Sequence, residues 1–199
     1  MEQKEILVPE PLVTGVGGTV RAGSTSEIAL RVALDGAQAA GARVRMFGAA
    51  DLDLPFYDPK SPDRTSKALE LVSALRASDG VIVASPGYHG ALSGMIKNAL
   101  DYIEDMAADP RAYLDGMPFG CIGVAHGSQA AVAVLTNLRG IAHALRAYPT
   151  PYGAAIVAGP RIFAGGACVD AQTTQRLRLI GTQVARMASE HAAMLSGTA

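Results

Sequence analysis

The chain has 199 residues, of which 49% are hydrophobic and 18% are charged, and its formal net charge is −1. This composition indicates a folded globule and argues against a broad basic surface for nucleic acid or an anionic membrane. It also argues against a strongly acidic protein that docks on basic partners.

Two cysteines occur, Cys121 and Cys168, and there is no CxxC motif. We therefore expect neither a disulfide framework nor a metal site, and Cys121, in the apolar run FGCIGVA, is predicted to be a small core residue. The N-terminal stretch MEQKEILVPEPLV lacks a basic segment followed by a continuous apolar core. No apolar run reaches the roughly 18 to 20 residues that a membrane-spanning helix needs, so we expect a cytoplasmic protein.

Apolar β-type runs alternate with helical patterns from one end of the chain to the other. The runs GVIVASP and PFGCIGVA are continuously apolar, as strands buried on both faces are. In chain order, the pattern predicts a strand at 11–17, a helix from Ser24 or Thr25 to about Ala40, a strand at 42–49, a helix at 65–79, a strand at 80–86, a helix at 91–106, a strand at 118–125, a helix at 128–147, a strand at 149–159 and a helix at 171–195.

This alternation of five strands and five helices predicts an α/β fold with a mostly parallel sheet and helices on both faces. No repeat or linker interrupts the pattern. One domain is therefore expected over residues 11–199, preceded by an arm over residues 1–10. In such sheets ligands bind outside the carboxyl ends of the strands, so the segments after the first, third and fourth strands are the candidate binding loops.

The first candidate loop, GGTVRAGSTS, places hydroxyl groups and an arginine directly before a helix. Hydroxyls and free backbone N–H groups at a helix N-terminus bind phosphate well, and the arginine adds a formal charge. The motif GxxxxGK(S/T) is absent and the spacing does not match GxGxxG, which argues against a P-loop or a dinucleotide fingerprint. The alternative is an ordinary helix cap formed by Ser24 or Ser26. The predicted phosphate ligands are Thr19, Arg21, Ser24, Thr25 and Ser26.

The second and third candidate loops, SPGYHG and AHGSQ, combine glycines with a histidine each. Glycines let the backbone approach a flat ligand closely, and an aromatic side chain can stack on its ring. The alternative for each histidine is a solvated loop residue without a role. No carboxylate pair and no Ser-His-Asp order indicates acid–base or acyl-transfer chemistry. The candidate residues here are Pro86, Gly87, Tyr88, His89, Gly90, His126 and Gly127.

Three motifs together resemble the NAD(P)H-dependent FMN reductase family of flavodoxin-like proteins. They are Gly18-Thr19-x-Arg21-x-Gly23-Ser24, Ser85-Pro86-x-Tyr88-x-Gly90 and Ser93-Gly94-x-x-Lys97-Asn98-x-x-Asp101. The run Asp53-Leu54-Pro55-Phe56-Tyr57-Asp58 is also similar to that family, and the resemblance covers about residues 11 to 160. Thr19 stands where the family more often has serine, and the segment His126-Gly127-Ser128 is less rich in glycine than usual.

The resemblance implies a flavodoxin-like three-layer sandwich with a five-stranded sheet of order 2-1-3-4-5 and FMN along its carboxyl edge. The five residues of the first loop would hold the phosphate. Residues 86–90 would line the isoalloxazine ring on one side, and His126 and Gly127 on the other. The flavin itself would carry the redox chemistry, so no side chain is expected to be catalytic.

The resemblance further implies hydride transfer from NADPH or NADH to FMN, and then onward to free flavin, a quinone, an azo compound or a similar acceptor. It leaves the preferred nicotinamide and the acceptor open. Homodimers or homotetramers are usual in the family, and a flavin-dependent monooxygenase is a further partner that it allows. Lys97 and Asp101 form either a solvated surface pair or a contact with a second subunit. The alternatives to a reductase are a flavodoxin-like electron carrier and a protein that binds another phosphorylated ligand.

Overall fold

The computed structural model describes residues 10–195, so the predicted N-terminal arm lies almost wholly outside the described residues. The sheet has the order β2-β1-β3-β5-β6, with β7 also paired to β5, and all of these pairs are parallel. Since β6 and β7 together occupy the fifth position, the predicted order 2-1-3-4-5 of a flavodoxin-like sheet is confirmed. The strands are β1 (Leu12–Gly17), β2 (Arg43–Phe47), β3 (Gly80–Tyr88), β5 (Pro118–Ala125), β6 (Tyr148–Pro149) and β7 (Ala154–Val157).

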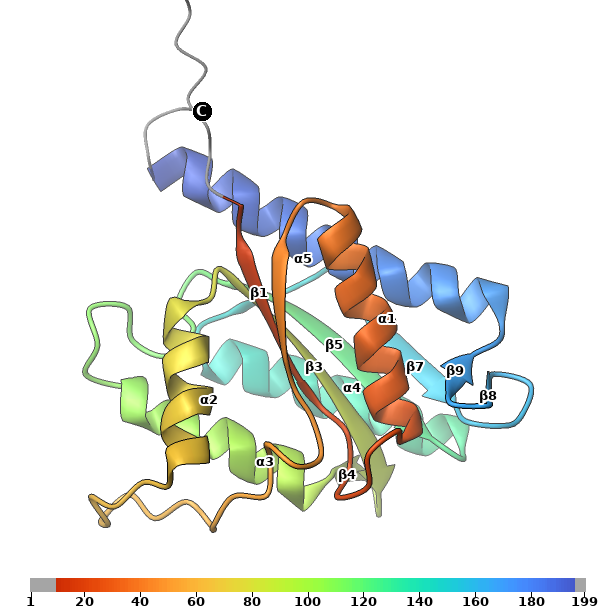
Figure 1. Ribbon diagram of the computed structural model, residues 1–199, viewed down its shortest axis with the longest axis horizontal. Helices are drawn as coiled ribbons and strands as arrows, with labels where there is room; N and C mark the ends of the chain where they lie inside the picture. Colours follow the sequence, from red (N-terminus) through yellow and green to blue (C-terminus); the bar gives the residue numbers. More distant parts are fainter. Residues whose placement is uncertain (1–9, 196–199) are drawn as a thin grey trace, which may run out of the picture.

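Helices cover both faces of the sheet (Figure 1). On one face α1 and α5 lie against apolar side chains of β1, β3, β5 and β7, and on the other face α2, α3 and α4 pack on the opposite side chains of the same sheet. The three predicted layers are therefore present. The helices are α1 (Thr25–Ala39), α2 (Ser66–Ala77), α3 (Gly94–Asp101), α4 (Ser128–Ala144) and α5 (Ala171–Leu195).

Two glycines bring α1 and α5 into close contact. A Cβ atom on Gly181 would lie 1.8 Å from the carbonyl oxygen of Ala33, and one on Gly36 would lie 2.3 Å from the carbonyl oxygen of Arg178. No side chain fits at either position without moving the helices apart. The two glycines therefore fix the distance between the helices on this face.

The predicted fifth strand is broken in two. Pro149 and Pro151 have no backbone N–H groups to donate to a neighbouring strand. Between them, the Thr150 N–H still donates to the Phe119 carbonyl at 2.9 Å, and the Thr150 hydroxyl donates to the carbonyl of Tyr152 at 2.9 Å. As a result β6 pairs with the beginning of β5 and β7 with its end. Beyond β7 an unpredicted hairpin of β8 (Phe163–Ala164) and β9 (Ala167–Cys168) precedes α5.

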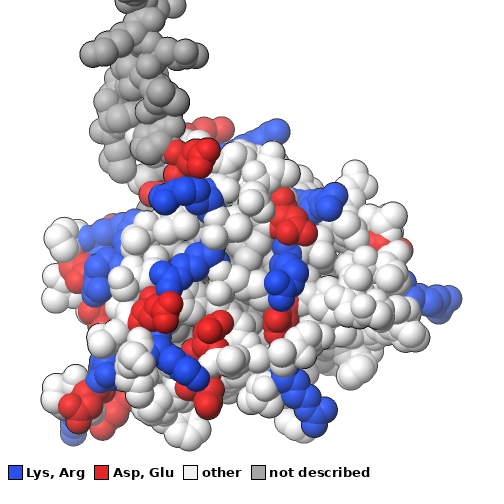
Figure 2. All heavy atoms as spheres, viewed as in Figure 1, with Lys and Arg blue, Asp and Glu red and all other residues white. Residues whose placement is uncertain are grey.

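The face of the molecule in Figure 2 carries both signs of charge. Lysine and arginine side chains alternate with aspartate and glutamate over this face, without a broad patch of one sign. Within residues 10–195, no helix combines the length and the apolarity that crossing a bilayer requires.

Candidate functional site

The register of the parallel strands brings the three predicted loops to one edge of the sheet. Gly17 at the end of β1 is opposite Ala84 of β3, and Pro86 of β3 is opposite Val124 of β5. The segments that follow these strands therefore start at nearly the same level. The three loops named from the sequence share the carboxyl edge of neighbouring strands.

The first loop, residues 18–24, is a tight turn that ends in a helix cap. Gly18 and Gly23 have φ angles of 122° and 71°, which few residues other than glycine adopt. Within the turn, the Arg21 N–H donates to the Thr19 hydroxyl at 3.1 Å. Ser24 caps α1, because its Oγ accepts the Glu27 N–H at 3.3 Å. The helix-cap interpretation of this loop is therefore right for Ser24.

The five predicted phosphate ligands differ in how accessible they are. Arg21 is exposed, and within the described residues its guanidinium has no ion pair. Thr19, Ser24 and Thr25 are half-buried, whereas Ser26 is fully buried and lies 3.4 Å from Ser24, measured between the two Oγ atoms. The loop thus offers one free cation and three accessible hydroxyls beside the positive end of α1, a donor set that suits a phosphate.

The second loop is a β-hairpin and not the irregular connection that the sequence suggested. The short strand β4 (Ala91–Leu92) pairs antiparallel with the end of β3, and α3 accordingly starts at Gly94 and not at residue 91. The two turn residues, His89 and Gly90, have φ angles of 50° and 87°. Two positive φ angles in a two-residue turn are typical of type I′, the form that matches the twist of a hairpin.

Buried hydrogen bonds fix this hairpin to the helix that follows it. Ser85 is fully buried, and its Oγ accepts the Ser93 N–H at 3.0 Å while donating to the Pro86 carbonyl at 3.0 Å. Ser93 then caps α3 by accepting the Ile96 N–H. Sequence reasoning overlooked Ser85 as a structural residue, although its position directly after a buried strand was visible.

The hairpin presents its tip to solvent and its base to the core. Residues Tyr88, His89 and Gly90 are exposed, with Tyr88 at 54%. Gly87 faces inward, because a Cβ atom there would lie 3.0 Å from the Val134 side chain of α4. The need for glycine at position 87 therefore comes from packing against α4, whereas the sequence argument attributed it to a ligand.

The third loop leads directly into α4. His126 and Gly127 are exposed, and Gly127 is the N-cap residue with φ −117° and no side-chain hydrogen bond to the helix. This φ is an ordinary extended value, so the glycine is not required by backbone geometry. A Cβ at position 127 would have no atom within 4 Å, and the same holds for positions 23 and 90. The carboxyl edge of the sheet thus brings together uncapped N–H groups, exposed aromatic and imidazole side chains and open space. This combination fits a flat phosphorylated ligand.

A family model described as NADPH-dependent FMN reductase matches residues 11–161. The chain belongs to this family. The resemblance expected from the three motifs, over about residues 11 to 160, is therefore confirmed, and all twelve predicted ligands lie inside the matched region.

Individual relatives of this FMN reductase family member cover shorter segments. An NADPH azoreductase of Bacillus sp. (strain OY1-2) is 30% identical over 87 residues, 43% of this chain and 46% of the relative. An FMN-dependent NADPH-azoreductase of Staphylococcus haemolyticus (strain JCSC1435) is 28% identical over 123 residues, 54% of this chain and 62% of the relative. The chain thus spans about half the length of these curated relatives.

A solved structure extends the likeness of fold over most of the chain. FerB of Paracoccus denitrificans, a flavoenzyme NAD(P)H:(acceptor) oxidoreductase, superposes with a TM-score of 0.72 at 22% identity. The alignment covers 91% of this chain and 98% of FerB. At this identity the comparison supports the flavodoxin-like fold of the FMN reductase family member.

Helix α3 holds the segment between β2 and α2. This segment contains residues 53–58, the run that resembles the family. The side-chain oxygen of Asn98 accepts the Tyr57 N–H at 2.9 Å, and its nitrogen donates to two carbonyls of the segment at 3.3 and 2.8 Å. The Tyr102 hydroxyl donates to the Pro55 carbonyl at 3.0 Å. Four hydrogen bonds, three from Asn98 of α3 and one from Tyr102 directly after it, thus fix the backbone of a loop that contains no regular structure.

An ion pair closes the same segment. The Arg64 guanidinium donates to both oxygens of Asp105, at 2.7 and 2.8 Å, and the Tyr57 hydroxyl donates to the same carboxylate at 3.2 Å. The hydrogen bonds from Arg64 hold the pKa of Asp105 below its usual value, and burial raises the pKa of Tyr57. We refer to Tyr57, Arg64 and Asp105 as the clasp.

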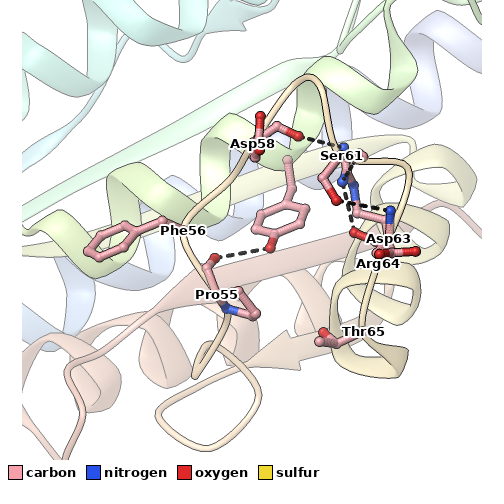
Figure 3. A pocket seen from close by; sticks show the side chains of 8 residues that line it. Pro55, Phe56, Asp58, Ser61, Asp63, Arg64 and Thr65 are labelled. Carbon is pink, nitrogen blue, oxygen red and sulfur yellow. Dashed lines mark hydrogen bonds between the residues drawn. The ribbon is translucent and has the colours of Figure 1, made fainter.

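A cavity of about 370 Å³ lies beside the clasp (Figure 3). Phe56 stands at its rim, 92% exposed, and points away from the other labelled residues (Figure 3). None of the twelve predicted ligands lines this cavity, so it is separate from the three loops. Its lining residues are Pro55, Phe56, Asp58, Ser61, Asp63, Arg64, Thr65 and Tyr102.

Proposed function

We propose that the protein is an FMN-dependent NAD(P)H oxidoreductase, with FMN bound along the carboxyl edge of the sheet. The observation that carries the proposal is the family match over residues 11–161, combined with the meeting of the three matched loops at that edge. The overall reaction moves a hydride from NADPH or NADH to the flavin and then passes electrons to a small acceptor.

The first loop is proposed to bind the FMN phosphate. Arg21 supplies the charge, and Thr19, Ser24 and Thr25 supply accessible hydroxyls beside the N-terminus of α1. Ser26, although named from the sequence, is buried beneath the loop and supports Ser24 from below.

The hairpin tip and the start of α4 are proposed to flank the isoalloxazine ring. Tyr88 offers an exposed aromatic face, and the uncapped N–H groups at Gly127 offer donors to the polar edge of the ring. His89 and His126 stand exposed on either side. When bound, the flavin supplies the hydride chemistry, so the protein needs only to orient it and leave one ring face accessible.

The proposal is tested by adding FMN to the purified protein and recording the flavin absorption and fluorescence. Oxidation of NADPH and of NADH is then followed with free flavin, a quinone and an azo dye as acceptors. Azo dyes are included because two relatives are named as azoreductases. Failure to bind FMN would end the proposal, whereas FMN that neither nicotinamide reduces would favour the electron carrier.

We also propose that the protein forms a homodimer or homotetramer through α3 and the loop before α2. Lys97 and Asp101 form an ion pair on α3, four residues apart and about half exposed. In a two-fold contact the same patch meets itself, so such a pair can exchange partners between two copies. The exposed Phe56 ring, on a loop fixed by the same helix, is the proposed apolar anchor.

A further inference from the structure

Glu27 is a buried carboxylate directly beneath the proposed phosphate loop. It lies in the first turn of α1 and is 7% exposed. An acidic residue here is unexpected, since a dianionic phosphate would bind at the same helix end. Its role therefore has to be compatible with anion binding at the same helix end.

Both oxygens of this carboxylate have partners. Oε2 accepts the N–H of Gly23 at 3.1 Å, and Oε1 accepts from the Arg31 guanidinium at 3.1 Å, one turn further along α1. Arg31 thereby offsets the negative charge, together with the positive end of the helix. Because its charge is offset in this way, the carboxylate can hold the loop through the hydrogen bond from Gly23 without strongly opposing an anion.

The bond to Gly23 determines how the loop faces the solvent. Gly23 has a φ of 71°, and its N–H is turned inward to the carboxylate. The neighbouring Ser24 Oγ accepts the Glu27 N–H, so the loop and the helix hold each other reciprocally. This arrangement is a variant of the capping box, in which the acidic side chain reaches one residue further back.

Glu27 also lies close to the segment that follows β2. A Cβ atom on Gly48, just after β2, would lie 3.5 Å from the Glu27 carboxyl carbon, and one on Gly18 would lie 3.5 Å from the Glu27 Cβ. Glu27 thus lies next to both glycines, one in the first loop and one directly after β2.

We infer that Glu27 is a positioning residue for the flavin phosphate: it holds Gly23 inward so that Arg21 and the loop hydroxyls face the ligand. This inference rests on the FMN site proposed above. It predicts that removing the carboxylate weakens the binding of FMN but not of a flavin without the phosphate. Charge repulsion alone would predict the opposite, since a carboxylate repels a phosphate.

The test compares FMN with riboflavin, which lacks the phosphate, by titrating flavin fluorescence against four variants. Glu27→Ala and Glu27→Asp, which remove or withdraw the acceptor, are expected to weaken FMN binding about tenfold. Riboflavin affinity is expected to stay within about twofold. Glu27→Gln, whose amide oxygen still accepts the Gly23 N–H, is expected to stay within about threefold of wild type for FMN. Glu190→Ala, an exposed helical glutamate on α5, is the matched control and should change neither.

Three outcomes would overturn the inference. Unchanged FMN affinity in Glu27→Ala would show that the loop needs no support, and tighter binding in both Glu27→Ala and Glu27→Gln would show that repulsion dominates. Equal losses for FMN and riboflavin would indicate a general structural role. If Glu27→Ala does not fold, Glu27→Asp and Glu27→Gln decide. Absence of FMN binding by the wild-type protein would instead sink the proposed function, so the two failures are distinguishable.

Discussion

In the phosphate site that we propose, Arg21 is the residue that supplies the positive charge. It is exposed, and no carboxylate of the described residues pairs with it. Arg21→Ala should therefore weaken FMN binding about 10- to 100-fold in a fluorescence titration, the effect of losing a hydrogen bond to a charged group. The control is Arg43→Ala, which removes an exposed arginine at the start of β2, the end of that strand away from the three loops. Equal affinity in the two variants would mean that the loop does not hold the phosphate.

Gly87 illustrates a residue whose role lies in packing. A Cβ at this position would lie 3.0 Å from the Val134 side chain and 3.1 Å from that of Ala125. Gly87→Val should lower the free energy of unfolding by about 1–3 kcal/mol, as overpacked sites do. Gly159→Val, where a Cβ has nothing within 4 Å and φ is not positive, is the control and should be nearly neutral in urea denaturation. A neutral Gly87→Val would contradict this packing.

The clasp joins the segment before α2 to the residues after α3, and its contribution to stability depends on pH. Because Arg64 lowers the pKa of Asp105 in the folded protein, the carboxylate stabilises the fold fully at neutral pH. That contribution is lost as the pH falls below about 4 and Asp105 becomes protonated. Asp105→Asn should thus cost about 1–3 kcal/mol at pH 7 and less at pH 3, measured by chemical denaturation. A cost independent of pH would show that the charge is unimportant.

At the level of elements, the sequence predicted the strands and helices well and their ends less well. Continuous apolar runs such as PFGCIGVA left little choice but a buried strand, and β5 occupies the same residues. The hairpin after β3 was missed, because Tyr88-His89-Gly90-Ala91 has no Asn-Gly or Asp-Gly signal and His89 adopts a positive φ. The division of the last strand into β6 and β7 follows from Pro149 and Pro151, which cannot donate to a neighbouring strand.

Contacts between distant segments explain what the sequence did not reveal about the site. The serine and glutamate of the run Ser24-Thr25-Ser26-Glu27 are a local capping signal, so Glu27 was within reach of sequence reasoning. Asn98 and Asp105, in contrast, act on residues more than 40 positions away in the sequence, and one sequence does not disclose such pairs. The burial of Ser26 likewise depends on how α1 packs on the sheet.

For the whole molecule, the decisive question is whether α3 and the loop before α2 join two copies. Because Phe56 is 92% exposed on a fixed loop, Phe56→Asp should lower the molar mass measured by light scattering relative to wild type. Lys97→Glu or Asp101→Lys alone should weaken assembly, since each leaves like charges facing across the contact, and the double reversal should restore it. Val169→Asp, at another exposed apolar position just before α5, is the control. A monomeric wild-type protein, or identical masses for Phe56→Asp and Val169→Asp, would contradict this interface.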